Sequence, residues 1–162
     1  MSRVKDAERR PAGSPIEAAE RTLAGRSKPT LVVPAESRLT FALPIPHRAT
    51  LRFYAAVPGG GGDASIVFRA GISDDRFYQT LVEQTVTSAD GAARGWIALA
   101  ADLSRFAGRQ LSLFYHPDAR RWRIVIATHV TGGSPGEAWL GEPAIVTDVE
   151  SARDYFRRLA SR

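Results

Sequence analysis

The sequence contains no cysteine and only one methionine, and it lacks any long hydrophobic run. The absence of cysteine excludes disulfide bonds, thiolate zinc sites and cysteine nucleophiles. A bilayer-spanning helix needs about 20 consecutive apolar residues, and no segment supplies them. The first ten residues are charged and lack the apolar stretch of a secretory signal. The sequence as written therefore predicts a cytoplasmic protein without a membrane span.

Lysine is also scarce, because Lys5 and Lys28 are the only lysines among the 22 basic residues. The formal net charge of +5 comes from the two ends of the chain. Residues 1–29 hold seven basic and four acidic residues, and residues 149–162 hold four and two. Residues 30–148 hold eleven of each sign. The central segment, residues 30–148, therefore has no net charge and is not expected to form the clustered basic face that neutralises phosphates. Nucleic-acid binding is not expected.

The chain of 162 residues is 44% hydrophobic and 24% charged, which is typical of one globular domain with tails. From residue 30 onward apolar residues recur with a period of two, between segments rich in Gly, Pro and Asp. No helix of crossover length separates these runs, which favours antiparallel pairing. We expect strands at 30–33, 39–43, 51–57, 66–72, 77–87, 95–100, 110–115, 122–130 and 139–146. The predicted fold class is all-β, an antiparallel jelly-roll β-sandwich over residues 30–147 with short N- and C-terminal helices.

Helical signals lie at both ends. Ser14, Pro15 and Glu17 resemble a helix start and Gly25 a helix stop, so residues 1–29 are expected to form a polar arm and a short helix. The segment 147–150 is a capping box that precedes an apolar stripe, which predicts a C-terminal helix over 148–162.

One further helical turn is expected between two strands. Asp102 is suited to cap a single turn that Gly108 closes, with Leu103 and Phe106 facing inward.

Several segments carry a resemblance to a known fold family. They are Ser37–Leu43, Ala49–Phe53, Ile66–Arg69, Gly95–Leu99, Asp102–Leu113 and Ala138–Pro143. Residues 38–146 resemble a galactose-binding-domain-like jelly roll, the fold of many carbohydrate-binding modules, and most resemble accessory domains found beside bacterial sulfatase or glycosyltransferase domains. The resemblance implies a binding function and places Trp96 and Trp139 at structural positions, so both are expected in the core.

Catalytic and metal-binding patterns are weak. The segment 132–136 matches G-x-S-x-G, but Pro135 follows the serine and a strand follows the loop, whereas a nucleophile elbow needs a helix there. The three histidines have no metal-ligand spacing. Asp74 and Asp75 are read as turn residues, with a structural calcium ion as the alternative. We expect no cofactor and no enzymatic activity, a hydrolase being the disfavoured alternative.

Two clusters combine an aromatic residue with arginine, as sugar sites do. Arg120, Arg121 and Trp122 lie at the start of a strand, and Arg76 and Tyr78 lie on either side of Phe77. For each cluster, packing at the sandwich edge is the alternative to ligand contact. His129 is added as a candidate because its strand position can face away from the core.

The predicted function is a non-catalytic binding or accessory domain that recognises a carbohydrate or glycoconjugate. The alternative is a protein-interaction or assembly module, attached to or partnering a polysaccharide-handling enzyme (a glycosyltransferase or sulfatase). In that alternative the terminal helices would contact the protein partner.

Overall fold

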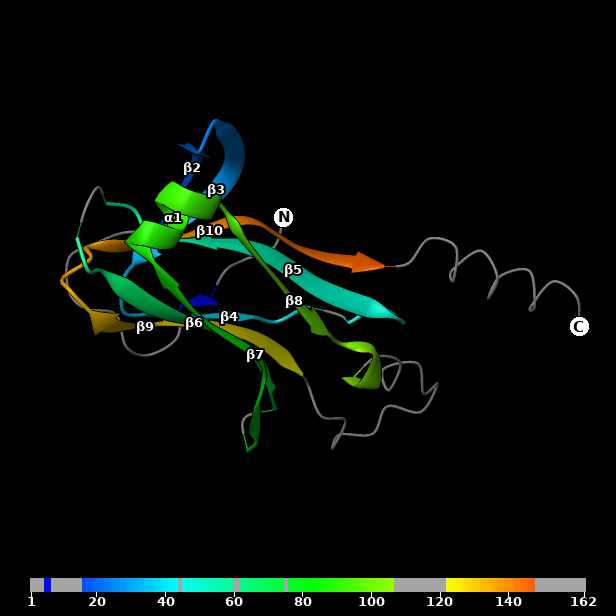
Figure 1. Ribbon diagram of the computed structural model, residues 1–162. Coiled ribbons are helices and arrows are strands. Elements are labelled where there is room, and N and C mark those ends of the chain that lie inside the picture. Colours follow the sequence, from blue (N-terminus) through cyan, green and yellow to red (C-terminus); the bar gives the residue numbers. More distant parts are fainter. Residues whose placement is uncertain are drawn as a thin grey trace, which may run out of the picture.

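A computed structural model describes residues 5–6, 16–43, 45–59, 62–74, 76–106 and 122–147, which form two antiparallel sheets packed face to face (Figure 1). Sheet A has the strand order β1-β4-β9-β6-β7, and sheet B has the order β2-β3-β10-β5-β8. The strands are β1 (Lys5–Asp6), β2 (Glu17–Leu23), β3 (Arg26–Pro34), β4 (Ser37–Phe41), β5 (Ala49–Ala56), β6 (Ser65–Ser73), β7 (Tyr78–Thr87), β8 (Ile97–Asp102), β9 (Arg123–Gly132) and β10 (Glu137–Thr147). The described helices are α1 (Ser88–Arg94) and the 3₁₀ turn η1 (Ser104–Phe106).

The strand order is that of a jelly roll. If β3 is counted as the first strand and β10 as the eighth, sheet B contains the order 1-8-3-6 and sheet A the order 2-7-4-5. Successive strands therefore cross repeatedly between the two layers, as two interlocked Greek keys require. Strands β1 and β2 extend one edge of each sheet. The predicted all-β antiparallel sandwich is confirmed.

The core lies between the sheets and follows from the alternation of apolar residues. Phe53 on β5 and Phe68 on β6 are the largest fully buried side chains, and Leu140 on β10 is buried with them. Side chains on one face of each strand meet those of the other sheet, and this removal of apolar surface from water stabilises the sandwich at about 25 cal/mol per Å².

The expected N-terminal helix is wrong, because residues 17–23 form strand β2. Strand β2 pairs with β3 over its whole length, from Glu17 opposite Val32 to Leu23 opposite Arg26. Ala24 and Gly25 have φ angles of 49° and 75°, and positive φ at both central residues defines the tight hairpin turn. An isolated helix of this length is marginal, and pairing with β3 satisfies more backbone groups. A helix over these residues therefore cannot be the contact for a protein partner.

Helix α1 lies between the strands expected at 77–87 and 95–100, where the sequence predicts only a connecting segment. Thr87 caps the helix by accepting the N–H of Asp90, and the Asp90 carboxylate accepts the N–H of Thr87 in return. Hydrogen bonds from Arg94 and Thr87 lower the pKa of Asp90 from 3.8 to about 2. Neither of the described helices has the length and apolar character of a membrane span.

The expected single turn after Asp102 is confirmed as η1. The Asp102 carboxylate accepts the N–H of Ser104 at 2.8 Å, and Leu103 is fully buried. Phe106 is half-buried rather than in the core. The predicted strand 110–115, most of the predicted arm 1–13 and the predicted helix 148–162 lie outside the described residues.

Candidate functional site

The outer face of sheet B carries an aromatic cluster that is not part of the core. On β10, Ala138 and Leu140 face the core, so Trp139 between them faces outward. Trp139 lies between Val32 and Ala56 of the neighbouring strands. Both neighbours are buried without belonging to the core cluster, as expected beneath a large side chain on this face.

Tyr54 on β5 and Trp96, just before β8, complete the cluster with Trp139. The Trp96 and Trp139 ring centroids are 6.0 Å apart, with an angle of 34° between the ring planes. All three rings are half-buried. The expectation that Trp96 and Trp139 are core residues is therefore wrong.

Two cations lie against these rings. The Lys28 Nζ atom is 3.7 Å from the centroid of the Tyr54 ring, and the Arg21 guanidinium carbon is 5.8 Å from that of Trp139. Each cation also contacts a carboxylate, Lys28 with Glu142 at 3.1 Å and Arg21 with Glu17 at 3.6 Å. We call the set Arg21, Lys28, Tyr54, Trp96 and Trp139 the aromatic patch. It combines flat apolar rings with a fringe of charged donors and acceptors.

Hydrogen bonds fix the orientation of both indoles. The Trp96 Nε1–H donates to the backbone oxygen of Arg26 at 2.9 Å, and the Trp139 Nε1–H donates to the Glu137 carboxylate at 2.8 Å. Gly141 lies beneath Trp96, because a Cβ atom there would be 3.0 Å from the Trp96 ring. The patch is therefore held in place before any ligand binds.

The residues predicted from the sequence lie elsewhere, on sheet A or near its end. A bulge between Ala70 and Gly71 interrupts the β6–β7 pairing, and the end of this hairpin turns away from sheet B (Figure 1). Phe77 is 51% exposed at this tip, and Arg76 is also exposed. Tyr78 packs over Gly71, and the guanidinium of Arg38 lies 5.2 Å from its ring centroid.

His129 lies on the outer face of sheet A, as expected, but far from Tyr78. It pairs with Val67 on β6, whereas Tyr78 pairs with Ser73, six residues further along the same strand. The His129 Nδ1 atom is 3.0 Å from the Glu36 carboxylate, which also accepts the N–H of Val130. Burial raises the pKa of Glu36, but the hydrogen bonds with His129 and Val130 outweigh that effect and lower it overall.

Trp122 packs at the edge of the sandwich. Its ring meets that of Phe106 edge to face, with the centroids 5.0 Å apart. Arg123, the next residue, pairs with Ser73 and so lies at the same end of sheet A as Tyr78. Arg120 and Arg121 lie outside the described residues. The structure thus brings Arg76, Tyr78 and Trp122 to one end of sheet A, while the role of each in ligand binding stays a prediction.

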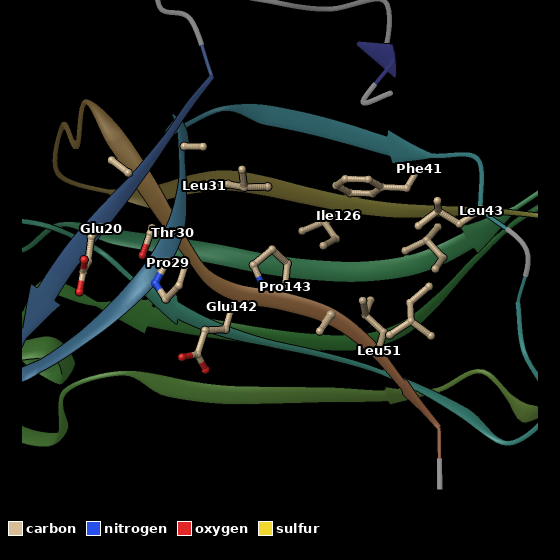
Figure 2. Close-up of a pocket in the computed structure, with 15 residues that line it drawn as sticks. Glu20, Pro29, Thr30, Leu31, Phe41, Leu43, Leu51, Ile126, Glu142 and Pro143 are labelled. Carbon is tan, nitrogen blue, oxygen red and sulfur yellow. The ribbon is translucent and has the colours of Figure 1, made fainter. Parts of the chain in front are cut away.

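A pocket of about 700 Å³ lies between the sheets (Figure 2). Sheet A contributes Phe41, Ile124 and Ile126 to its lining, and sheet B contributes Leu31 and Ile145. Its volume falls in the range of small-molecule sites, about 300–1,000 Å³. The residues at its mouth are exposed, among them Ala18, Glu20, Pro29, Glu142 and Ala144.

The pocket opens where β3 and β10 separate. Their pairing ends at Gly141 opposite Thr30. On the other side of β10, its pairing with β5 has a register shift between Gly141 and Ala144. Pro29 and Pro143 have no N–H to donate at this point, so neither can continue the ladder. Glu142, the residue before Pro143, adopts a φ angle of 46°. The gap in sheet B is therefore built into the sequence.

The described residues that matched metal-binding or nucleophile patterns in the sequence do not form such a site in the structure. Asp74 accepts the N–H groups of Arg76 and Phe77, which is the turn-forming arrangement, while Asp75 lies outside the described residues. Within the described parts of the chain, no group of three or more His, Asp or Glu residues is placed to hold a metal ion. The segment 133–136 is the loop that joins β9 to β10, as expected for the G-x-S-x-G match.

No protein-family model matches the chain, and no curated protein matches it. Three solved structures share its general shape at low identity. The CBM22-1 xylan-binding domain of Xyn10C from Paenibacillus barcinonensis is 13% identical, with 83% of this chain and 81% of that chain covered and a TM-score of 0.47. The N-terminal cellulose-binding domain of β-1,4-glucanase C from Cellulomonas fimi is 15% identical, with 75% and 78% covered and a TM-score of 0.40. The xylan-binding module CBM15 is 11% identical, with 87% and 94% covered and a TM-score of 0.38. The strand order given above, rather than these likenesses, defines the fold.

Proposed function

We propose that the protein is a non-catalytic carbohydrate-binding domain whose ligand surface is the aromatic patch on sheet B. The observation that carries the proposal is the presence of three half-buried aromatic rings on the solvent side of a sheet. The core does not use these rings. Sugar rings present C–H faces that pack on aromatic rings, and their hydroxyl groups need polar partners at the edges.

The polar fringe of the patch supplies such partners. Glu137 and Glu142 can accept hydrogen bonds from sugar hydroxyls, and Lys28 can donate to them. Because Lys28 and Glu142 already contact each other, the patch presents paired charges rather than a field of one sign. This arrangement favours a neutral glycan over a strongly acidic one.

Calorimetric titration with soluble oligosaccharides tests the proposal. The panel includes fragments of xylan and cellulose, the polysaccharides named for the structures compared above. We expect Trp139→Ala to weaken binding by about tenfold or more, which corresponds to about 1.4 kcal/mol. Tyr78→Ala on the opposite sheet is the matched control. It should leave the affinity within about twofold, because a mutation far from the patch, without a shared partner, changes the binding free energy there by at most a few tenths of a kcal/mol, or roughly 0.3–0.5 kcal/mol.

Tryptophan fluorescence locates the ligand independently of stability. The chain has three tryptophans, so Trp122→Phe leaves only the two in the patch. Their emission should change on saturation with glycan. If calorimetry detects binding while this emission stays constant, the patch is not the site.

The tip of the β6–β7 hairpin is a second candidate surface for the same function. Phe77 is the exposed large hydrophobic residue of the described chain, and it lies between Arg76 and Tyr78. Binding that is lost in Tyr78→Ala and Arg76→Ala but retained in Trp139→Ala would move the site to this tip and overturn the patch as the ligand surface.

A further inference from the structure

The lining of the pocket suits an apolar guest and not a sugar. Leu51, Ile124 and Ile126 are buried at its depth, whereas Leu31, Phe41 and Ile145 pack against the core with part of their surface left uncovered. Among the described residues no buried side-chain nitrogen or oxygen lacks a partner. Hydroxyl groups placed there would lose their hydrogen bonds to water without gaining partners in the protein, which disfavours a sugar. An alkyl chain would instead bury apolar surface on both sides.

The mouth of the pocket adjoins the aromatic patch. Lys28 contacts both, with Nζ 3.7 Å from the Tyr54 ring centroid and 3.1 Å from the Glu142 carboxylate. Figure 2 shows Glu142 pointing away from the apolar lining while Pro143, the next residue, lies beside Pro29 at the opening. Gly141, the residue before Glu142, lies under Trp96. Three consecutive residues of β10 thus lead from the patch to the pocket.

We propose that the patch and the pocket bind one ligand, a glycan that carries an alkyl chain. The sugar packs on Tyr54, Trp96 and Trp139, and the chain enters through the gap between β3 and β10 to lie between the sheets. The proposal rests on the carbohydrate function proposed above, and it names the ligand class as a glycoconjugate with a hydrocarbon tail. The continuity through Lys28 and Gly141–Pro143 favours this occupant over a free hydrocarbon or a free sugar.

A series of alkyl glycosides tests the joint site. Methyl, butyl, hexyl and octyl β-glucosides and β-xylosides are titrated by calorimetry below their micellar concentrations, with 1-octanol as the probe that lacks a sugar. Each methylene that enters the pocket should tighten binding roughly three- to four-fold. Methyl resonances of Leu31, Ile126 and Ile145 should shift with the hexyl and octyl glycosides and not with the methyl glycosides.

A substitution that fills the mouth of the pocket tests whether the alkyl chain enters there. Ala18 is exposed and lines the mouth, so Ala18→Phe should block the chain without disturbing the core. The variant should bind the octyl and methyl glycosides equally, so the gain with chain length disappears. Ala93→Phe places the same side chain on the exposed surface of α1 and should keep the gain.

The outcomes separate this proposal from the proposed function. Glycan binding that depends on Trp139 but not on chain length overturns the joint site and leaves the carbohydrate function intact. If 1-octanol binds as tightly as the octyl glycoside, and Trp139→Ala leaves both affinities unchanged, the pocket is a separate apolar site and the joint site is overturned. If the unsubstituted protein binds none of the glycans or alkyl glycosides, both proposals are overturned.

Discussion

At the scale of single residues, Gly141 lets two side chains of the patch lie flat against β10. A Cβ atom at this position would be 3.0 Å from the Trp96 ring and 3.3 Å from the Lys28 Cδ atom. Both distances are shorter than ordinary van der Waals contact, so either the ring or the lysine stem must move. The arrangement of the patch therefore depends on the absence of a side chain here.

We expect Gly141→Ala to weaken glycan binding and to change the near-ultraviolet circular dichroism of the tryptophans. Gly136→Ala is the control, because a Cβ atom there meets nothing within 4 Å. The loss of affinity should be about 1 kcal/mol or more, within the usual range for forced repacking. An unchanged tryptophan signal with unchanged affinity in Gly141→Ala would show that the ring positions do not matter for the ligand.

Trp139 also marks where sequence reasoning failed for the site. Ala138, Trp139 and Leu140 form a continuous apolar run, and such a run does not reveal which residues face the core. Ala138 and Leu140 are both buried in the core, so Trp139 between them must face outward. This direction becomes clear only when the pairing of β10 with its neighbours is known. His129 was a candidate because its strand position can face away from the core, and the structure places it on the outer face of sheet A. The pocket had no sequence signal except the two prolines, which are 114 residues apart.

At the scale of elements, the β2–β3 hairpin places Ala24 in a conformation that alanine disfavours. Its φ angle is 49°, and the left-handed region costs about 1–2 kcal/mol for a residue with a Cβ atom. Ala24→Gly should therefore raise the free energy of unfolding by about 0.5–1 kcal/mol, after allowance for the greater entropy of glycine in the unfolded chain. Gly25→Ala, at a φ of 75°, should lower it by a similar amount.

Urea denaturation of both variants measures these changes. The two substitutions also distinguish the hairpin from the helix that the capping signals predict. In a helix that ends at Gly25, Ala24→Gly would destabilise the protein by up to about 1 kcal/mol. A decrease in stability for Ala24→Gly would contradict the hairpin.

The elements with clear alternation were predictable, whereas those decided by distant partners were not. Strand β6 alternates Ile66, Phe68, Ala70 and Ile72 on its buried face, so its position followed from the period alone. Strand β2 has only three apolar residues among seven, two of them alanine, and it carries good helix signals, so only its pairing with β3 makes it a strand. Helix α1 has only seven residues, and its N-cap Thr87 is also the last residue of a clear strand pattern, so the sequence predicts the strand and not the helix that follows it.

At the scale of the whole molecule, the balance of charge distinguishes a glycan-binding domain from one that binds a polyanion. Residues 30–148 carry equal numbers of basic and acidic residues, and the cations of the patch are already paired with carboxylates. A neutral glycan that packs on such a surface releases few counterions. A protein that neutralises 6–10 phosphates, by contrast, loses about 10³–10⁵ in affinity between 50 and 200 mM salt.

We therefore expect the dissociation constant of a bound neutral glycan to change by less than about twofold between 50 and 500 mM sodium chloride, because apolar packing is not screened. Calorimetric titration at both concentrations measures the change. A random DNA duplex, followed by fluorescence anisotropy under the same conditions, serves as the electrostatic comparison. Steep salt dependence of glycan binding would mean that the ligand must open the Lys28–Glu142 pair or that it is itself acidic. The second case would move the site toward the arginines of sheet A, where Arg38 lies beside Tyr78.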